Sequence, residues 1–316
     1  MPGIGVISNP RSRENLRDPG AMRRLAWLIG SRGAAATTAT LDDLYRVAEE
    51  WRRERIDLLC INGGDGTIHC TLTAFIRVFA GAPLPPVAIL RGGTMNTIAG
   101  ALGVRGDTAR ILFELVDRYH HGDELPLVQK ELLAVGDAYG FIFGNGVIYN
   151  FLDAYYGTGR PSPETAARLL ARGALSSLVH GRFSRDLTRR VRVRVTVDGE
   201  RWPREDFMTV AAACIEDIGL GFRPFPRANE RPGAFAVLGI HARHALDLVL
   251  DLPRMLRGQP MRPSKAIHAL ASELRFESDE PVDYVIDGDG YRGGRELRIG
   301  VGPRLSFVRL DARAGR

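Results

Sequence analysis

Two stretches of the sequence share one pattern, in which an apolar run ends in two glycines and a helical pattern follows. The first is IDLLCINGGDGT at 56–67, and the second is VAILRGGTMN at 87–96. This pattern is typical of a strand in a parallel sheet that passes through a tight turn into a helix. Backbone N–H groups at such a turn, together with the helix dipole, favour a bound anion such as a phosphate.

Strand-like and helix-like segments alternate over the first 120 residues. We expect strands at 4–10, 34–40, 56–62 and 87–93, and helices at 20–31, 41–54, 69–79 and from Asn96 onward. The alternation predicts an α/β domain with a mostly parallel sheet at residues 1–124. Ligands bind such sheets at the carboxyl ends of the strands, where the unusual glycines lie.

The pattern changes after residue 125, where short apolar runs with period two are bounded by Gly, Pro and Asp. This change predicts an antiparallel β-sandwich domain at 125–316, whose last strand is a candidate to return to the first domain. Helical patterns at about 162–188 and 242–257 add helices to the sandwich.

Composition places the chain among ordinary globular proteins. It has 316 residues, 45% hydrophobic and 25% charged, which suits two domains and excludes a disordered chain. The net charge of +6 is carried by arginine, since Lys130 and Lys265 are the only lysines. Such a surface attracts phosphates and anionic membranes, but nothing in the sequence requires nucleic acid. The spacing of Cys60, Cys70 and Cys214 fits neither a disulfide framework nor a zinc site, so we expect a cytoplasmic protein.

A carboxylate stands inside the first glycine turn. Gly63, Gly64 and Gly66 leave room for a phosphate to approach the backbone, whereas Asp65 would repel a phosphate. No lysine lies nearby, which excludes a P-loop. Asp65 therefore indicates a Mg²⁺ site or a proton acceptor beside a phosphoryl group. The alternative is a structural glycine turn with Asp65 as the N-cap of its own helix.

The second glycine turn adds polar groups of the kind that bind phosphates. Thr94 and Asn96 can form hydrogen bonds, Arg91 supplies positive charge, and Gly93 leaves the backbone open. Two such turns in one parallel sheet suit the phosphate chain of a nucleotide. As a purely structural feature, Thr94 or Asn96 would be one more helix N-cap.

Three motifs in this order resemble the diacylglycerol kinase catalytic superfamily, which includes bacterial soluble lipid kinases, sphingosine kinases and ceramide kinases. The motifs are SNP at 8–10, GGDGT at 63–67, and GGTMN at 92–96 followed by Ala99 and LGV. The resemblance implies a first domain like that of NAD kinase and phosphofructokinase. It also implies that Asn9 binds the nucleotide base or ribose, that Thr38 lies on the phosphate side, and that Gly64, Asp65, Gly66, Thr67, Thr94 and Asn96 bind the phosphates and Mg²⁺.

The segment YVIDGDG at 284–290 resembles the strand of this family that ends in Asp-Gly-Glu. The resemblance puts Asp289 at the last acid, close to the acceptor hydroxyl, and Asp287 at the preceding acid. If the segment is extended, both side chains face the same way and both are candidate catalytic groups. The alternative is a hairpin turn with solvated acids.

Three positions depart from the family pattern. Cys70 stands where the family usually has a glutamate, with His69 beside it, and Thr97 replaces an aspartate of the Mg²⁺ network. Pro232 occupies the place of an aspartate that holds a structural Mg²⁺ in other members. The sequence thus lacks the acid for that structural metal.

Together these patterns predict an ATP-dependent, Mg²⁺-dependent lipid kinase. We expect Asp65 or Asp289 to accept the proton of a lipid hydroxyl, in diacylglycerol or in a ceramide or sphingoid lipid, as it attacks the γ-phosphorus of ATP. The partner is a lipid at an anionic membrane surface, which the protein meets from the cytoplasmic side, and a homodimer is possible.

Two basic amphipathic segments, 164–195 and 243–265, are the candidates for membrane contact. The first contains Arg168, Arg172, Arg182, Arg185, Arg189 and Arg190. Alternatively, both segments pack their apolar sides inward and leave the arginines in solvent.

Two other functions remain open. An NAD kinase-like enzyme shares GGDGT but needs an Asn-Glu pair on a strand, and the only such pair here, Asn229 and Glu230, falls in a Pro-rich segment. A catalytically weak nucleotide-binding or lipid-binding module would fit the departures at Cys70, Thr97 and Pro232.

Overall fold

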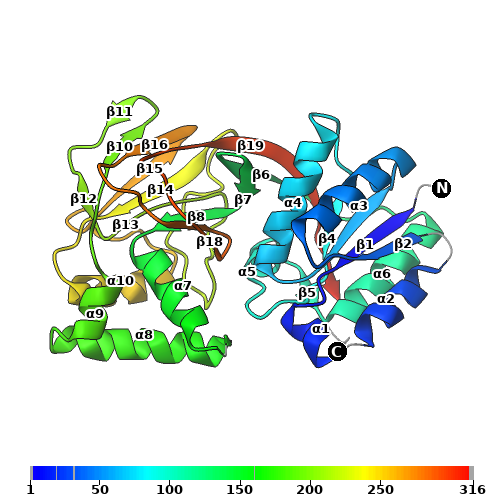
Figure 1. Cartoon of the computed structure of the whole chain (residues 1–316), viewed down its shortest axis with the longest axis horizontal. Coiled ribbons are helices and arrows are strands. Elements are labelled where there is room, and N and C mark those ends of the chain that lie inside the picture. Colours follow the sequence, from blue (N-terminus) through cyan, green and yellow to red (C-terminus); the bar gives the residue numbers. More distant parts are fainter. Residues whose placement is uncertain (1–2, 19, 31–32, 160, 313–316) are drawn as a thin grey trace. The chain divides into compact units, whose positions relative to one another are not determined.

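The computed structural model describes residues 3–18, 20–30, 33–159 and 161–312. The chain divides into two compact units, Met1–Lys130 with Arg304–Arg316 (unit 1) and Glu131–Pro303 (unit 2). The sequence places the domain boundary at residue 124, and that boundary stays a prediction. Figure 1 shows the ribbon coloured along the sequence.

Unit 1 is built on a parallel sheet in the order β2-β1-β3-β4-β19. The strands are β1 (Ile4–Ser8), β2 (Gly33–Thr37), β3 (Leu58–Asn62), β4 (Val87–Ile89) and the end of β19 (Glu296–Val308). Phe307 of β19 pairs with Val87 of β4, so the C-terminal part of the chain completes the first sheet.

Helices cover both faces of this sheet (Figure 1). They are α1 (Arg13–Arg17), α2 (Ala21–Ile29), α3 (Leu41–Glu54), α4 (Asp65–Phe79), α5 (Thr97–Ala101) and α6 (Thr108–His121). The short strands β5 (Arg105–Gly106) and β20 (Asp311–Ala312) pair with each other. Helix α3 packs beside α4, and α2 beside α6.

Helix α3 illustrates how the sequence specifies these elements. Thr40 and Asp43 form a capping box at its N-terminus, which satisfies N–H groups that the helix leaves free. Leu44, Val47 and Trp51 are buried at helical spacing, so the apolar stripe faces the sheet.

The order of the strands defines where a ligand fits. From β1 the chain moves to β2 on one side and then crosses to β3 on the other, so its direction reverses between β1 and β3. The carboxyl ends of these strands diverge at such a switch point, and the adjoining loops leave a crevice. The first glycine turn follows β3 at this point.

The described residues of unit 2 form antiparallel strands and four helices. One sheet has the order β15-β14-β13-β8-β17-β18, and the other strands include β10, β16 and the first part of β19. The strands are β6 (Leu127–Val135, which begins in unit 1), β7 (Ala138–Gly140), β8 (Ile142–Asn145), β9 (Val191–Arg192), β10 (Arg194–Val197), β11 (Glu200–Arg201), β12 (Asp206–Phe207), β13 (Thr209–Ala213), β14 (Phe235–Ile240), β15 (Ala266–Ala271), β16 (Glu273–Glu277), β17 (Tyr284–Ile286) and β18 (Asp289–Tyr291). The helices are α7 (Val147–Gly157), α8 (Pro163–Leu178), α9 (Arg182–Leu187) and α10 (Ala245–Leu256).

The core of unit 2 has two layers. Val210 and Ala212 of β13 pack in a cluster with residues of β10 and β16, while Ala211 and Ala213 face a second cluster that contains Met255 of α10. Alternate residues of β13 thus enter different clusters, which explains why the whole strand is apolar.

The fold class predicted from the sequence is confirmed: a mostly parallel α/β sheet and an antiparallel β domain with added helices. Among the described residues no helix is long and apolar enough to span a membrane.

Helix α7 was not predicted. Its sequence, VIYNFLDAYYG, is rich in β-branched and aromatic residues that favour strands, but packing on β8, β17, α8 and α9 makes it a helix. The single helix predicted at 162–188 is two helices, because His180 adopts a positive φ of 50° and Gly181 starts a tight corner.

We predict that Gly5→Ala destabilises unit 1. A Cβ at Gly5 would lie 2.6 Å from Cζ3 of Trp51, which is buried in α3. The free energy of unfolding in urea should fall by about 1–3 kcal/mol, as overpacking of a core does. The matched control is Gly100→Ala on the exposed side of α5, where nothing lies within 4 Å, and it should not destabilise the protein. Equal effects of the two changes would contradict the packing argument.

Candidate active site

The ends of β1 and β3 are joined by a network of asparagines. The Asn9 backbone N–H donates to the carbonyl of Asn62 at 3.0 Å, and Asn9 Nδ2 donates to Thr67 Oγ1 at 2.8 Å. Asn62 is fully buried and donates through Nδ2 to Ser8 Oγ and Asn15 Oδ1, at 3.1 and 3.0 Å. Hydrogen bonds among these polar residues therefore hold the ends of β1 and β3 together at the switch point.

The two glycine turns touch each other through their backbones. A Cβ on Gly93 would lie 2.3 Å from Cα of Gly64, and a Cβ on Gly92 would lie 2.3 Å from Oδ1 of Asn62. Within the first turn, a Cβ on Gly63 would lie 2.4 Å from Cβ of Thr67. These glycines are required because the chain packs against itself, a reason that the sequence alone did not reveal.

Asp65 connects the two turns. It is the first residue of α4, whose N-cap is Gly64, so the alternative of Asp65 as the N-cap of its own helix is wrong. Its carboxylate instead accepts the backbone N–H groups of Thr97 at 3.1 Å and Ile98 at 3.0 Å, at the start of α5. One side chain thus fixes the second turn against the first.

Opposing effects act on the charge of Asp65. Surrounding protein atoms raise the pKa of its carboxyl group above the usual value, and the two N–H donors, the Thr97 side chain and the positive charge of Arg91 partly oppose that increase. A cation beside the carboxylate would favour its ionised form further.

The second turn is closed by its own asparagine. Asn96 adopts the left-handed region with φ of 50°, accepts the Gly93 N–H through Oδ1 at 3.0 Å and donates through Nδ2 to the Gly93 carbonyl at 3.1 Å. The side chain of Arg91 donates to the Val104 carbonyl at 2.6 Å, which fixes its position near Asp65.

The other predicted nucleotide-binding residues lie at the same ends of the strands. Thr38 directly follows β2, is buried, and donates its N–H to the Ser8 carbonyl at 3.1 Å. Thr94 is half-buried in the second turn, and Gly66 lies in the first turn of α4. Asn15 and Asn62 were missed by sequence reasoning; the only signal was that Asn62 ends an apolar strand directly before two glycines.

The donor set of unit 1 fits a Mg²⁺ ion that is shared with a nucleotide. Mg²⁺ in kinases is usually held by one or two carboxylates together with phosphate oxygens and waters. Each oxygen of Asp65 accepts one backbone N–H, and a carboxylate oxygen can accept more than one partner. Asp65 is the residue that would hold the ion.

The Asp-Gly-Asp segment of unit 2 is a hairpin, so the predicted extended segment is wrong. Ile286 pairs with Asp289, and Asp287 and Gly288 form the turn with φ of 48° and 92°. Asp287 is not solvated either: its carboxylate accepts the N–H groups of Phe141 at 3.0 Å and Ile142 at 2.8 Å. Asp287 therefore anchors the loop before β8, while Asp289 is half-buried at the start of β18.

Tyrosines surround this hairpin. The rings of Tyr284 and Tyr291 stack with centroids 5.4 Å apart, and the Tyr156 hydroxyl lies 3.4 Å from the place of a Cβ on Gly288. On α7, burial and then Asp283 raise the pKa of the Tyr149 hydroxyl. Sequence reasoning did not identify these aromatic side chains.

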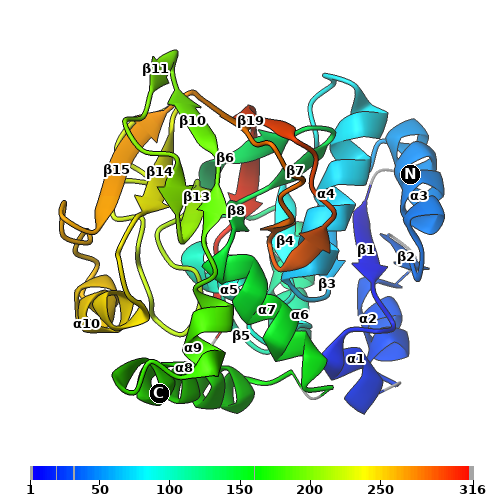
Figure 2. The ribbon, with the colours of Figure 1, turned by 60° about the vertical axis from the view of Figure 1, so that its left-hand side comes forward.

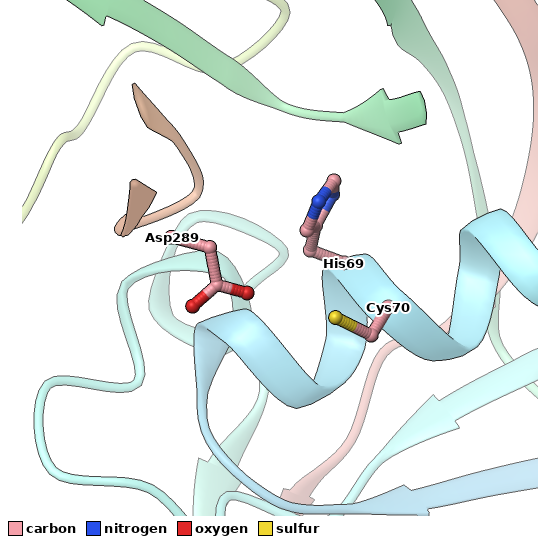
Figure 3. A group of neighbouring side chains, drawn as sticks. All are labelled: His69, Cys70 and Asp289. Atoms are coloured by element: carbon pink, nitrogen blue, oxygen red, sulfur yellow. The ribbon is translucent and has the colours of Figure 1, made fainter. Parts of the chain in front are cut away.

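The positions that depart from the family pattern are now placed. Figure 3 shows His69 and Cys70 as consecutive residues of α4, and it labels Asp289, which belongs to unit 2. Thr97 donates its N–H to Asp65. Pro232 lies in an exposed loop. Asn229 and Glu230 are also outside any strand, and Glu230 is paired with Arg227 at 2.6 Å.

Comparisons with known proteins agree with this geometry. A model of the diacylglycerol kinase catalytic domain matches residues 3–123. A model of the YegS C-terminal NAD kinase β-sandwich-like domain matches residues 173–304. The chain belongs to the diacylglycerol kinase catalytic-domain superfamily.

Similar proteins span nearly the whole chain. Proteins named "Probable lipid kinase YegS" from Escherichia coli O127:H6 and from E. coli K12 are 23% and 26% identical over 314 residues, 98% of this chain and 96% of theirs. A crystal structure of a diacylglycerol kinase from Bacillus anthracis covers 97% of this chain and 96% of its own, with a TM-score of 0.65 at 15% identity. Another structure from that organism reaches a TM-score of 0.72 at 16% identity. These likenesses show the fold, and the family makes the protein a lipid kinase.

We predict that Asp65→Asn loosens α5 as well as the site. An asparagine keeps one accepting oxygen and turns an NH₂ group toward the second N–H donor. The free energy of unfolding should fall by about 1–3 kcal/mol, the cost of an unsatisfied buried donor. Chemical denaturation measures this change.

The control is Asp107→Asn. Asp107 accepts the Arg110 N–H at 3.0 Å as the N-cap of α6, and asparagine serves equally well at an N-cap. If Asp65→Asn were as stable as Asp107→Asn, Asp65 would not be the link between the turns.

Proposed function

We propose that the protein is an ATP-dependent lipid kinase that transfers the γ-phosphate to a hydroxyl of a neutral membrane lipid, either diacylglycerol or a ceramide or sphingoid lipid. The observation that carries this proposal is the junction of two glycine turns at a switch point of a parallel sheet, with a carboxylate between them. A nucleotide phosphate chain needs backbone N–H donors on two sides and a place for a cation, and the two adjoining glycine turns with Asp65 between them support the proposal of such a site.

The residues of unit 1 bind and orient the nucleotide. Asn9 is held by Thr67 and Asn62 on the side proposed for the base or ribose. The glycines of the two turns and Arg91 lie beside the phosphates in this proposal, and Asp65 would hold Mg²⁺. The ion, once bound, neutralises charge that develops on the transferred phosphoryl group.

The proton acceptor is best assigned to Asp289. Asp65 is fixed by two backbone donors in one orientation, which suits a metal ligand better than a base that must follow a moving proton. Asp287 is committed to the N–H groups of Phe141 and Ile142. The resemblance to the family puts Asp289 close to the acceptor hydroxyl, and its side chain is half-buried at the start of β18.

The alternatives have less support. The Asn229 side chain donates to Glu216, and Glu230 pairs with Arg227, so the pair lacks the strand position that an NAD kinase requires. A weak nucleotide-binding module would explain Cys70 and Thr97, but Thr97 still contributes an N–H to the Asp65 link.

Incubation with labelled ATP, Mg²⁺ and a panel of acceptors tests the function. We expect phosphate to appear on diacylglycerol, ceramide or sphingosine in a reaction that a chelator stops, and not on NAD. Labelled NAD, or no labelled product with any lipid, would contradict the proposal. The midpoint temperature of thermal unfolding should rise with MgATP in the wild type and not in Asp65→Asn, because a ligand that binds only the folded state stabilises that state.

Asp289→Asn tests the base. The turnover number should fall by about 10²–10⁴-fold, the range for losing a general base, while MgATP binding is kept. The control is Asp279→Asn, an exposed carboxylate of unit 2 that pairs with Arg194 at 3.1 Å and should leave turnover unchanged. Normal turnover in Asp289→Asn would remove Asp289 from the mechanism.

A further inference from the structure

Helix α8 of unit 2 leaves large apolar side chains in solvent. Leu175, Leu178 and Val179 are 67%, 61% and 77% exposed. The opposite side of the helix is packed, since Ala166 and Leu169 form a small core with Tyr155 of α7. In Figures 1 and 2, α7, α9 and α10 lie on one side of α8, and no other described element of unit 2 lies on the other side. The inward packing expected for this segment therefore accounts for only one of its faces.

Arginines stand beside these apolar side chains along a groove of about 640 Å³. The groove is lined by Arg168, Arg172, Leu175, Val179, Arg182 and Phe183, with small residues between them. Residues 168, 172 and 175 follow each other at helical spacing and form one stripe of α8, which Val179 extends as the C-cap of the helix. One stripe thus carries positive charge at one end and apolar surface at the other.

The cations of the groove are available to an anion. Neither Arg168 nor Arg172 is in an ion pair within the described ranges, and Arg182 forms only an exposed pair with Asp186 at 3.6 Å. The guanidinium carbon of Arg172 lies 4.1 Å from the centre of the Phe183 ring, which holds this cation in place. Positioned guanidinium groups bind phosphate oxygens well.

The corner between α8 and α9 fixes the shape of the groove. The Gly181 N–H donates to the Ser176 carbonyl at 2.8 Å, and the Ser184 N–H donates to Ser176 Oγ at 3.1 Å. A Cβ on Gly181 would lie 2.5 Å from Ser176 Oγ, so only glycine fits there. Ordering of this groove on binding should therefore cost little.

The charge of the whole segment favours a membrane over a second protein chain. Residues 163–190 contain six arginines and two acidic residues. Of the six, Arg190 is used internally, because it donates to the Ala242 carbonyl at 2.6 Å. Exposed leucines beside arginines are typical of helices that lie in the headgroup region of anionic bilayers.

We propose that the α8–α9 groove binds the headgroup phosphate of an anionic phospholipid, while Leu175, Leu178 and Val179 enter the boundary between headgroups and acyl chains. The guanidinium groups of Arg168, Arg172 and Arg182 recognise the phosphate. The site goes beyond the proposed function, since the bound phospholipid is an anchor and not the phosphate acceptor, and membrane binding needs no phosphoryl transfer.

Vesicle flotation of the full chain tests this site. We expect binding to phosphatidylcholine vesicles that contain phosphatidylglycerol, weaker binding at high salt, and little binding to phosphatidylcholine alone. The double change Arg168→Gln with Arg172→Gln should weaken binding roughly 10-fold, because each basic residue near an anionic surface adds a several-fold gain. Leu175→Ser with Val179→Ser should weaken it to a similar degree.

The matched control replaces two exposed arginines of the same unit, Arg192 and Arg231, with glutamine and should bind as the wild type does. Variants that bind like this control would overturn the proposal. Binding of inorganic phosphate without binding to either kind of vesicle would also overturn it. So would a wild-type dimer that the double change Leu175→Ser with Val179→Ser turns into a monomer. Phosphorylation of a short-chain, water-soluble diacylglycerol should be equal in all these proteins, which separates failure of this site from failure of the kinase.

Discussion

The pair of hydrogen bonds from Thr97 and Ile98 to the Asp65 carboxylate holds the candidate active site together. It joins segments that are 32 and 33 residues apart, and it brings the glycines of both turns into backbone contact. The same side chain is the one that we propose to hold a cation. Structure and chemistry therefore depend on one buried carboxyl group, whose pKa is raised by burial while the neighbouring donors oppose that rise.

The threonine at position 97 affects the charge beside Asp65. At this position many members of the family carry an aspartate, which would place a second negative charge beside Asp65. The Thr97 hydroxyl carries no charge, and it favours the ionised form of the Asp65 carboxyl in addition to the backbone N–H, which any residue would supply. The departure from the family pattern thus favours the charged form of the Asp65 carboxylate and adds no second acid beside it.

Much of this could be predicted from the sequence, because hydrophobic periodicity reports which faces are buried. This periodicity predicts the strands of unit 1 and the change to short period-two strands after residue 125. Contacts between distant segments left no such signal: Asp65 bonding to α5, Gly93 lying on Gly64, and Asp287 anchoring the loop at Phe141. Helix α7 was missed for a related reason, since its residues favour strands and only its neighbours make it helical.

Amide hydrogen exchange of the full chain with and without MgATP tests the central claim, that the two turns form one phosphate site through Asp65. Residues 63–67 and 92–98 should gain protection together in the wild type, and neither segment should gain it in Asp65→Asn. Protection of only one turn, or of neither, in the wild type would contradict the claim.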